Sequence, residues 1–134
     1  MAKQTIKSRQ IVALCDDLLR LEREKLARLM AQKDQLQLDR ARVCEVIDGA
    51  NMLNSRLIEM SVERLSSIDK QLHRLENLIN AQRAQVNDAA VRLKAAEASL
   101  RSVRLREALE QRRTEEAELV ERAVWEWLDK APIR

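Results

Sequence analysis

Only one glycine, Gly49, and one proline, Pro132, occur in the 134 residues of this chain. Sheets and compact multi-helix folds need several tight turns, and turns draw heavily on these two residue types. A chain with so few helix breakers that is rich in Ala, Glu, Lys, Leu, Arg and Gln is typical of long helices. We therefore expect an all-α protein, and the length fits a single domain spanning residues 1–134.

Apolar residues in the second half of the chain recur with the period of 3.5 residues that defines a coiled coil. One row of the repeat contains Leu65, Leu72, Ile79, Val86, Leu93 and Leu100. The other row contains Ile68, Leu75, Gln82, Ala89, Ala96 and Val103. Only Gln82 is polar among these positions, so the pattern predicts a long helix that packs along one apolar stripe.

A weaker seam runs through the first half. Its predicted members are Ile11, Leu14, Leu18, Glu22, Leu26, Leu29, Lys33, Leu36, Arg40, Val43 and Ile47. The spacing around Glu22 is four, four and then three residues, which predicts a stutter that locally unwinds the supercoil.

The strongest break between the two seams is the stretch 48–55, which reads Asp-Gly-Ala-Asn-Met-Leu-Asn-Ser. Gly49 is expected to end one helix in the left-handed conformation, and Asn51, Asn54 or Ser55 to cap the next. These signals predict a helix over about 5–47, a turn over about 48–55 and a second helix over about 56–130. The two helices then form an antiparallel coiled-coil hairpin.

A turn at Ser66-Ser67 is the alternative, and it gives arms of equal length but cuts the start of the clearer heptad run. With the turn near residue 52, residue i lies opposite residue 104 − i. The predicted pairs are Leu29 with Leu75, Leu36 with Ile68, and Leu18 with Val86. Glu22 then lies opposite Gln82, so the two polar seam positions could meet and set the register; the alternative is that Gln82 is a tolerated defect.

Unequal arms leave residues 101–130 without a partner inside the chain. This segment still carries apolar residues at helical spacing: Leu105, Leu109, Ala117, Val120, Val124, Trp127 and Leu128. Its charges are sorted, with Arg101, Arg104, Arg106, Arg112 and Arg113 first, followed by Glu115, Glu116, Glu118, Glu121, Glu126 and Asp129. An apolar stripe without a partner predicts a docking surface, although a frayed helix or homodimerisation through this segment would also account for it.

The two tryptophans are the only aromatic residues, and they stand two positions apart near the C-terminus. Trp127 follows the stripe, whereas Trp125 lies about 200° away around the helix. Tryptophan is enriched in interface hot spots, so both are candidate partner contacts. Simple packing of the pair against the N-terminal segment is the alternative.

Residues that could carry chemistry are sparse. A single glycine excludes a glycine-rich phosphate loop, and His73 is expected to be exposed. Cys15 and Cys44 have no second cysteine or histidine within four residues, which argues against a metal site or disulfide. We expect a non-enzymatic protein without catalytic, cofactor-binding or metal-binding residues, because two paired helices offer no concave site.

Charge and hydropathy bear on partners and location. The formal net charge is +3, and the charges of both signs are mixed, so no nucleic-acid partner is expected. No apolar run is long enough for a transmembrane helix, and the N-terminus lacks a signal-peptide core. A cytoplasmic protein without direct membrane insertion is therefore expected.

The C-terminal part resembles a known family. It runs Leu-Arg-Ser-Val-Arg-Leu-Arg-Glu-Ala-Leu-Glu-Gln-Arg-Arg over 100–113, continues with the acidic stretch 115–122 and reaches Trp-Leu-Asp-Lys-Ala at 127–131. With the basic N-terminus and the break at 48–55, this layout resembles the FliJ family of flagellar export proteins and its YscO-type injectisome counterparts. The likeness covers most of the chain in layout and residues 100–130 in sequence.

The resemblance implies a central stalk of a type III secretion or flagellar export apparatus. Family members bind the hexameric secretion ATPase, link it to the membrane export gate and, in some cases, bind export chaperones. The implied location is cytoplasmic and peripheral to that apparatus. The expected partner-binding residues are Arg101, Arg104, Leu105, Arg106, Leu109, Arg112, Arg113, Val120, Val124, Trp125 and Trp127. A generic dimeric coiled-coil scaffold or adaptor is the alternative function.

Overall fold

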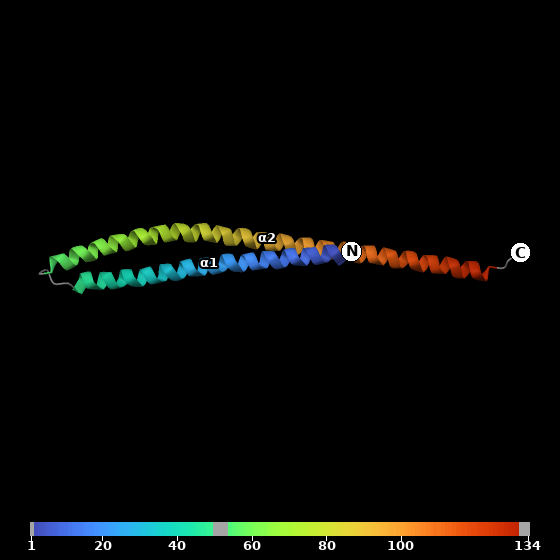
Figure 1. Cartoon of the computed structure of the whole chain (residues 1–134), viewed down its shortest axis with the longest axis horizontal. Helices are drawn as coiled ribbons and strands as arrows, with labels where there is room; N and C mark the ends of the chain where they lie inside the picture. The colour runs from blue at the N-terminus through green and yellow to red at the C-terminus, as the bar shows by residue number, and fades with distance from the viewer. Residues whose placement is uncertain (1, 50–53, 132–134) are drawn as a thin grey trace. The chain divides into compact units, whose positions relative to one another are not determined.

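Two long helices make up the part of the chain that the structure, a computed structural model, describes: residues 2–49 and 54–131. Helix α1 spans Ala2–Gly49 and helix α2 spans Ser55–Lys130 (Figure 1). No strand occurs among these described residues. The helices pack against each other, so the predicted all-α helical hairpin is confirmed. Helix α1 begins three residues before its expected start and ends two residues after its expected end. Helix α2 begins one residue early and ends at Lys130, as predicted.

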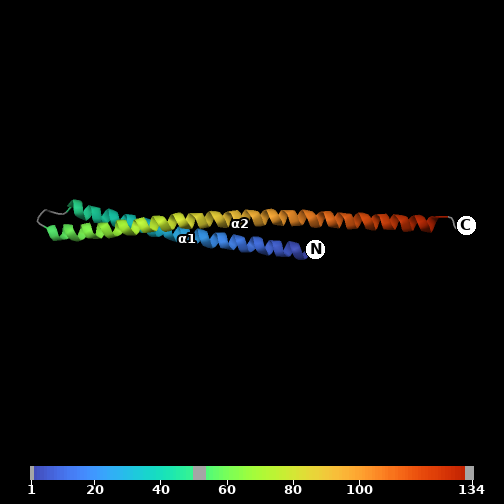
Figure 2. The same ribbon diagram turned by 90° about the horizontal axis from the view of Figure 1, so that it is seen from above.

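The helices pack in two units. Residues 16–92 form one of them, and the residues up to Cys15 form the other together with those from Leu93 onward. Within the first unit, the two helices run side by side in opposite directions, as two views at right angles show (Figures 1 and 2). The core of this unit consists of Leu19, Ile68, Leu75 and Ile79, each no more than 6% exposed. Its apolar side chains supply most of the packing free energy, because long helices are marginal without a partner.

The seam on α2 follows the predicted heptads. All twelve residues of the two rows from Leu65 to Val103 are buried or half-buried. The same spacing continues toward the N-terminus of α2 through half-buried Ile58 and buried Ser61. An uninterrupted period of 3.5 residues keeps one stripe of α2 facing α1.

The predicted start of the α1 seam is wrong. Ile11, Leu14 and Leu18 are exposed, and Leu19 is buried instead. The half-buried or buried seam positions in this stretch are Thr5, Ser8, Val12, Cys15, Leu19, Glu22 and Leu26. They alternate by three and four residues without interruption, so the expected stutter at Glu22 does not occur and Leu18 does not lie in the seam opposite Val86. An unbroken heptad on α1 matches the unbroken heptad on α2. The packing gained along the whole seam therefore exceeds what burial of Ile11, Leu14 and Leu18 would contribute.

The later half of the α1 seam follows the prediction. Leu26, Leu29, Lys33, Leu36, Val43 and Ile47 are half-buried. Arg40 is the exception because it is exposed and reaches across to Asp69, with 2.8 Å between Nε and Oδ1. The hydrogen bond to Asp69, and then the charge of that carboxylate, raise the pKa of Arg40 above its ordinary value. Lys33 makes a second cross-helix ion pair, with Glu76 at 3.8 Å.

Glu22 and Gln82 meet across the seam, as the register predicted. The amide of Gln82 donates to the backbone carbonyl oxygen of Glu22 at 2.9 Å and also to the Glu22 carboxylate. The sum of the two residue numbers is 104, the value expected for a turn centred near residue 52. These two polar seam residues therefore contact each other rather than apolar side chains.

The helices end and begin at the predicted break. The backbone oxygen of Asn54 accepts from the amides of Leu57 and Ile58 at 3.1 and 3.2 Å, so Asn54 stands at the N-cap position. Gly49 is the last residue of α1 and has no positive φ, so the left-handed conformation expected for it is wrong. The predicted cap at Asn51 lies outside the described residues. The alternative turn at Ser66-Ser67 is also wrong, because both serines lie inside α2.

Candidate partner-binding surface

The covered face of α2 ends at Glu107. Leu100, Val103 and Glu107 are half-buried, and the hydroxyl of Thr5 donates to the Glu107 carboxylate. Every residue from Ala108 to Lys130 is exposed. We call residues 108–130 the overhang. The segment without a partner therefore begins seven residues later than the expected position 101. Part of this difference arises because α1 begins at Ala2 rather than near residue 5. The rest arises because Thr5 contacts Glu107, whereas the predicted register places Thr5 opposite residue 99.

The apolar residues of the overhang form a stripe that is not a continuation of the hairpin seam. At about 100° of rotation per residue, Leu105 lies roughly 160° from both Val103 and Glu107, on the opposite side of α2. Helical spacing places further exposed apolar residues on this same outer side. We define the outer stripe as Leu105, Leu109, Val120, Val124 and Trp127, whose exposures range from 47% to 69%. It is free of α1 along its whole length.

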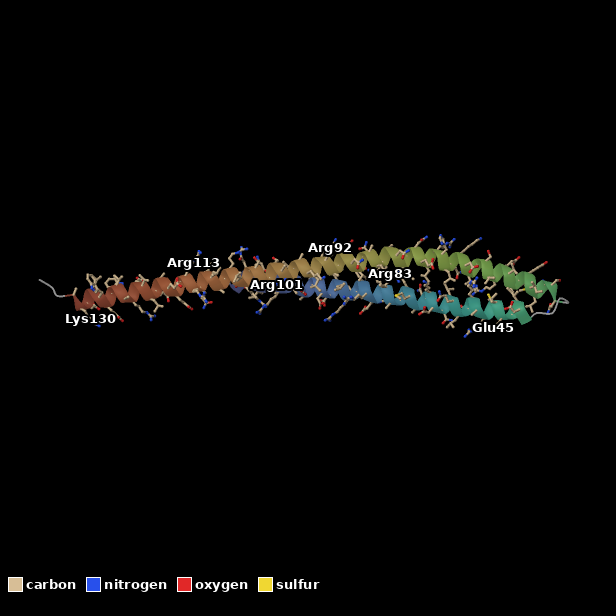
Figure 3. The ribbon with its side chains drawn as sticks, turned by 180° about the vertical axis from the view of Figure 1, so that it is seen from behind. Glu45, Arg83, Arg92, Arg101, Arg113 and Lys130 are labelled. Atoms are coloured by element: carbon tan, nitrogen blue, oxygen red, sulfur yellow. The ribbon has the colours of Figure 1, made fainter. Side chains whose placement is uncertain are left out.

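Between Leu109 and Val120, charged residues occupy the outer side. Arg113 and Glu116 fall within this gap at the helical spacing of the stripe, and both are exposed. Arg113 is labelled on this stretch of α2 in Figure 3. Among the ion pairs of the described residues, none includes Arg113 or Glu116, so both charges are available to a partner.

All eleven predicted partner-binding residues are exposed on α2. The structure places five of them together in the outer stripe. Arg101, Arg104 and Arg106 lie beside the part of α2 that α1 still covers. Trp125 is 61% exposed and lies away from the outer stripe, so the two tryptophans do not share one face. Packing of the pair against the N-terminal segment is excluded by their exposure.

Sequence reasoning missed a second exposed apolar group, on α1. Ile6, Ile11 and Leu14 are 51%, 54% and 60% exposed. Two of them were assigned to the seam, because larger apolar residues are normally preferred there. The available signal was the alternative heptad phase through Val12 and Cys15, which fits Leu19 and Leu26 without a stutter. Continuity of the repeat was the better guide than side-chain size.

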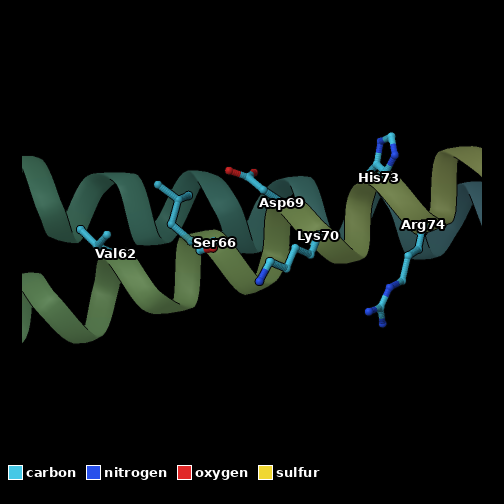
Figure 4. Close-up of a pocket in the computed structure, with 7 residues that line it drawn as sticks. Val62, Ser66, Asp69, Lys70, His73 and Arg74 are labelled. Carbon is cyan, nitrogen blue, oxygen red and sulfur yellow. The ribbon is translucent and has the colours of Figure 1, made fainter.

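The groove shown in Figure 4 is open and shallow, and its lining comes from α2 alone. It includes Asp69, Lys70 and His73, of which Asp69 is already paired with Arg40. His73 is exposed, as predicted. Cys15 and Cys44 are free and half-buried. Within residues 2–49 and 54–131, no group of three or more His, Cys, Asp or Glu side chains is arranged to hold a metal ion.

Neither described helix contains a stretch long and apolar enough to cross a membrane. The chain matches no family model, and no curated protein or solved structure matches it.

Proposed function

We propose that this protein is a non-enzymatic central-stalk component of a type III secretion or flagellar export apparatus. In this role it binds the secretion ATPase hexamer and couples it to the membrane export gate, from a cytoplasmic position at the apparatus. The observation that carries the proposal is the overhang, in which every residue from Ala108 to Lys130 is exposed although the segment is helical.

The form of the molecule supports this role. A paired region stiffens α2, and the overhang presents an apolar stripe flanked by arginine and by glutamate. A ring of identical subunits offers the same surface several times, and a single helix can contact these surfaces in turn. The resemblance to the FliJ and YscO-type proteins lies in residues 100–130, which include the whole overhang.

The test is a pull-down with the tagged full-length protein from its own cell extract, followed by mass spectrometry of the bound proteins. We expect a hexameric Walker-type ATPase and an export-gate membrane protein to be recovered. The purified ATPase should then hydrolyse ATP faster in the presence of this protein. Recovery of neither protein would contradict the stalk, and recovery of the protein alone would favour the dimeric scaffold.

Two variants distinguish specific binding through the overhang from non-specific binding by exposed apolar side chains. Val120→Asp with Val124→Asp places two charges on the outer stripe, so ATPase recovery should be lost. Val62→Asp with Val91→Asp makes the same chemical change at two exposed valines outside the overhang, 50% and 66% exposed. This control should recover the ATPase as the wild type does. Equal recovery with both variants would show that the outer stripe does not bind the ATPase.

A further inference from the structure

The outer stripe and the charges within it have a two-fold pattern along the sequence. Leu109 and Val120 are centred on position 114.5, and so are Leu105 and Val124. The charged pair Arg113 and Glu116 has the same centre. All six residues lie on one side of α2 and are exposed. A segment with this symmetry is complementary to a second copy of itself in the antiparallel direction.

We infer that two copies of this protein pair through the outer stripe as an antiparallel coiled coil, with the two-fold axis between Thr114 and Glu115. Each residue i then lies opposite residue 229 − i of the second copy. Leu109 packs on the partner's Val120, and Leu105 lies beside the partner's Val124. Each interaction occurs twice, because the two copies present the same surface.

At the centre of the pairing, Arg113 of each copy lies opposite the partner's Glu116. These two reciprocal ion pairs take the place of apolar residues in the middle of the stripe. Polar residues at such positions set register and orientation in coiled coils, at some cost in stability. A register shift of seven residues in either direction would leave Arg113 without its carboxylate, because the residue opposite it would be Leu109 or Ala123.

The wider charge distribution favours the antiparallel direction. Residues 101–114 contain five arginines and two glutamates, whereas residues 115–129 contain six acidic residues and one arginine. Antiparallel pairing places the basic half of one copy along the acidic half of the other. Parallel pairing would place like charges together over the whole segment, which is unfavourable. A second copy is therefore the occupant that this surface fits.

Access to the surface also allows this pairing. Leu105 and Leu109 face away from the side of α2 that Thr5 contacts through Glu107. The paired stretch spans residues 102–127 and is about 39 Å long. The outer stripe and its two central charges are spaced by four, four and three residues, which is an 11-residue repeat, and this stretch holds two of them. The inference does not rest on the proposed function. The two are linked because both use the outer stripe, so a dimer and an ATPase complex would exclude each other.

Charge reversal of full-length protein tests the pairing directly. Arg113→Glu alone places two glutamates at each central contact, and Glu116→Arg alone places two arginines there. Each variant should be monomeric in analytical ultracentrifugation at concentrations where the wild type is dimeric. An equimolar mixture of the two should form a heterodimer. One chain then carries glutamate at both positions and the other carries arginine at both, so each central contact is an ion pair. The double variant Arg113→Glu with Glu116→Arg should dimerise like the wild type.

Orientation has its own measurement. A spin label at Asp129→Cys, in a chain with Cys15→Ala and Cys44→Ala, should report a separation of about 44 Å along the dimer axis. A parallel dimer would bring the two labels to the distance between neighbouring helix axes, about 10 Å plus the label arms. Far-UV circular dichroism of the charge-reversal variants should match the wild type, because Arg113 and Glu116 are exposed.

The inference is overturned by any one of three results. These are a wild type that stays monomeric at high concentration, single variants that dimerise as tightly as the wild type, and a mixture of the two single variants that stays monomeric. A wild type that is monomeric and yet recovers the secretion ATPase would assign the outer stripe to that partner and leave the proposed function standing. A wild type that dimerises as inferred but recovers no ATPase would support the dimer and contradict the proposed function.

Discussion

The amide of Gln82 donates to the backbone carbonyl oxygen of Glu22 at 2.9 Å and to the carboxylate of the same residue. Each residue is a polar member of an otherwise mainly apolar stretch of seam. Because the two lie at the same level of the hairpin, neither is left facing apolar side chains. A slip of one heptad would separate them and bring each against an apolar row, which opposes the slip.

Replacing both residues by leucine should stabilise the hairpin and make its register less specific. Gln82→Leu alone should cost about 1–2 kcal/mol, since it leaves the Glu22 carboxylate beside an apolar group. Glu22→Leu with Gln82→Leu should exceed wild-type stability by about 1–3 kcal/mol, as when buried ion or polar pairs are replaced by packed apolar residues. Urea unfolding followed by circular dichroism measures the stability of the wild type, of Gln82→Leu and Glu22→Leu alone, and of the double variant. If the single and double effects simply add, the pair does not act as a unit.

The heptad phase of α1 is tested by two neighbouring leucines. Leu19 is 4% exposed and Leu18 is 43% exposed. Leu19→Ala should therefore destabilise the hairpin by about 2–4 kcal/mol, whereas Leu18→Ala should cost less than about 1 kcal/mol. Both substitutions change helix propensity equally, so the difference reports burial alone. A larger loss for Leu18→Ala in thermal unfolding would restore the seam through Ile11, Leu14 and Leu18.

Much of the fold followed from the sequence because α2 repeats a single strong pattern. Twelve heptad positions with one polar member define one face of a helix, and the single glycine between the two seams favours a turn at 48–55 over the alternative at Ser66-Ser67. The start of α1 was mispredicted because two heptad phases compete there, one through Ile11, Leu14 and Leu18 and one through Val12, Cys15 and Leu19. The sequence of α1 alone does not distinguish the two heptad phases, because the phase that is buried depends on how α1 packs against the seam of α2.

The candidate surface was predictable in its residues but not in its geometry. Exposure of Val120, Val124 and Trp127 followed from the unequal arms. The start of the overhang depended on where α1 begins, and helix ends are the least certain feature of a sequence pattern. That Leu105 and Leu109 lie on the far side of α2 from α1 became clear only once Val103 and Glu107 were placed in the seam.

Gly49 offers a stabilising substitution. It is the final residue of α1 and has no positive φ. Apart from the adjoining helix backbone, a methyl group added there would meet no atom of the described residues within 4 Å. Gly49→Ala should raise the free energy of unfolding by about 0.4–1 kcal/mol, because alanine restricts the unfolded chain and favours the helix. Denaturant unfolding measures the gain. Destabilisation would mean that the end of α1 requires a backbone conformation that alanine resists.

The overhang should tolerate charge without losing helix. Val120→Asp with Val124→Asp alters two side chains that are 63% and 49% exposed and that contact no part of α1. Helix content by circular dichroism should therefore remain close to that of the wild type, with the change confined to partner binding. A large loss of helix would show that these valines belong to the packed core of the hairpin.

Glu107 is the position where stability can be gained at the end of the seam. Its Oε2 accepts from the Thr5 hydroxyl, whereas its shielded Oε1 has no hydrogen-bond partner. A shielded, unpaired carboxylate oxygen is unfavourable, and the preceding members of the seam, Leu100 and Val103, are apolar. Glu107→Leu should therefore stabilise the pairing of the first turns of α1 by about 1–2 kcal/mol.

Hydrogen exchange at the amides of residues 6–12 measures this local effect, because the ends of helices open without global unfolding. Exchange should slow about tenfold in Glu107→Leu, the factor that corresponds to about 1.4 kcal/mol. Thr5→Val is the matched change on the other helix. It should speed exchange, because it removes the one hydrogen bond that the Glu107 carboxylate accepts from residues 2–49 and 54–131. Slower exchange in both variants would mean that the Thr5 contact contributes nothing and that apolar burial alone decides where the pairing of α1 with α2 ends.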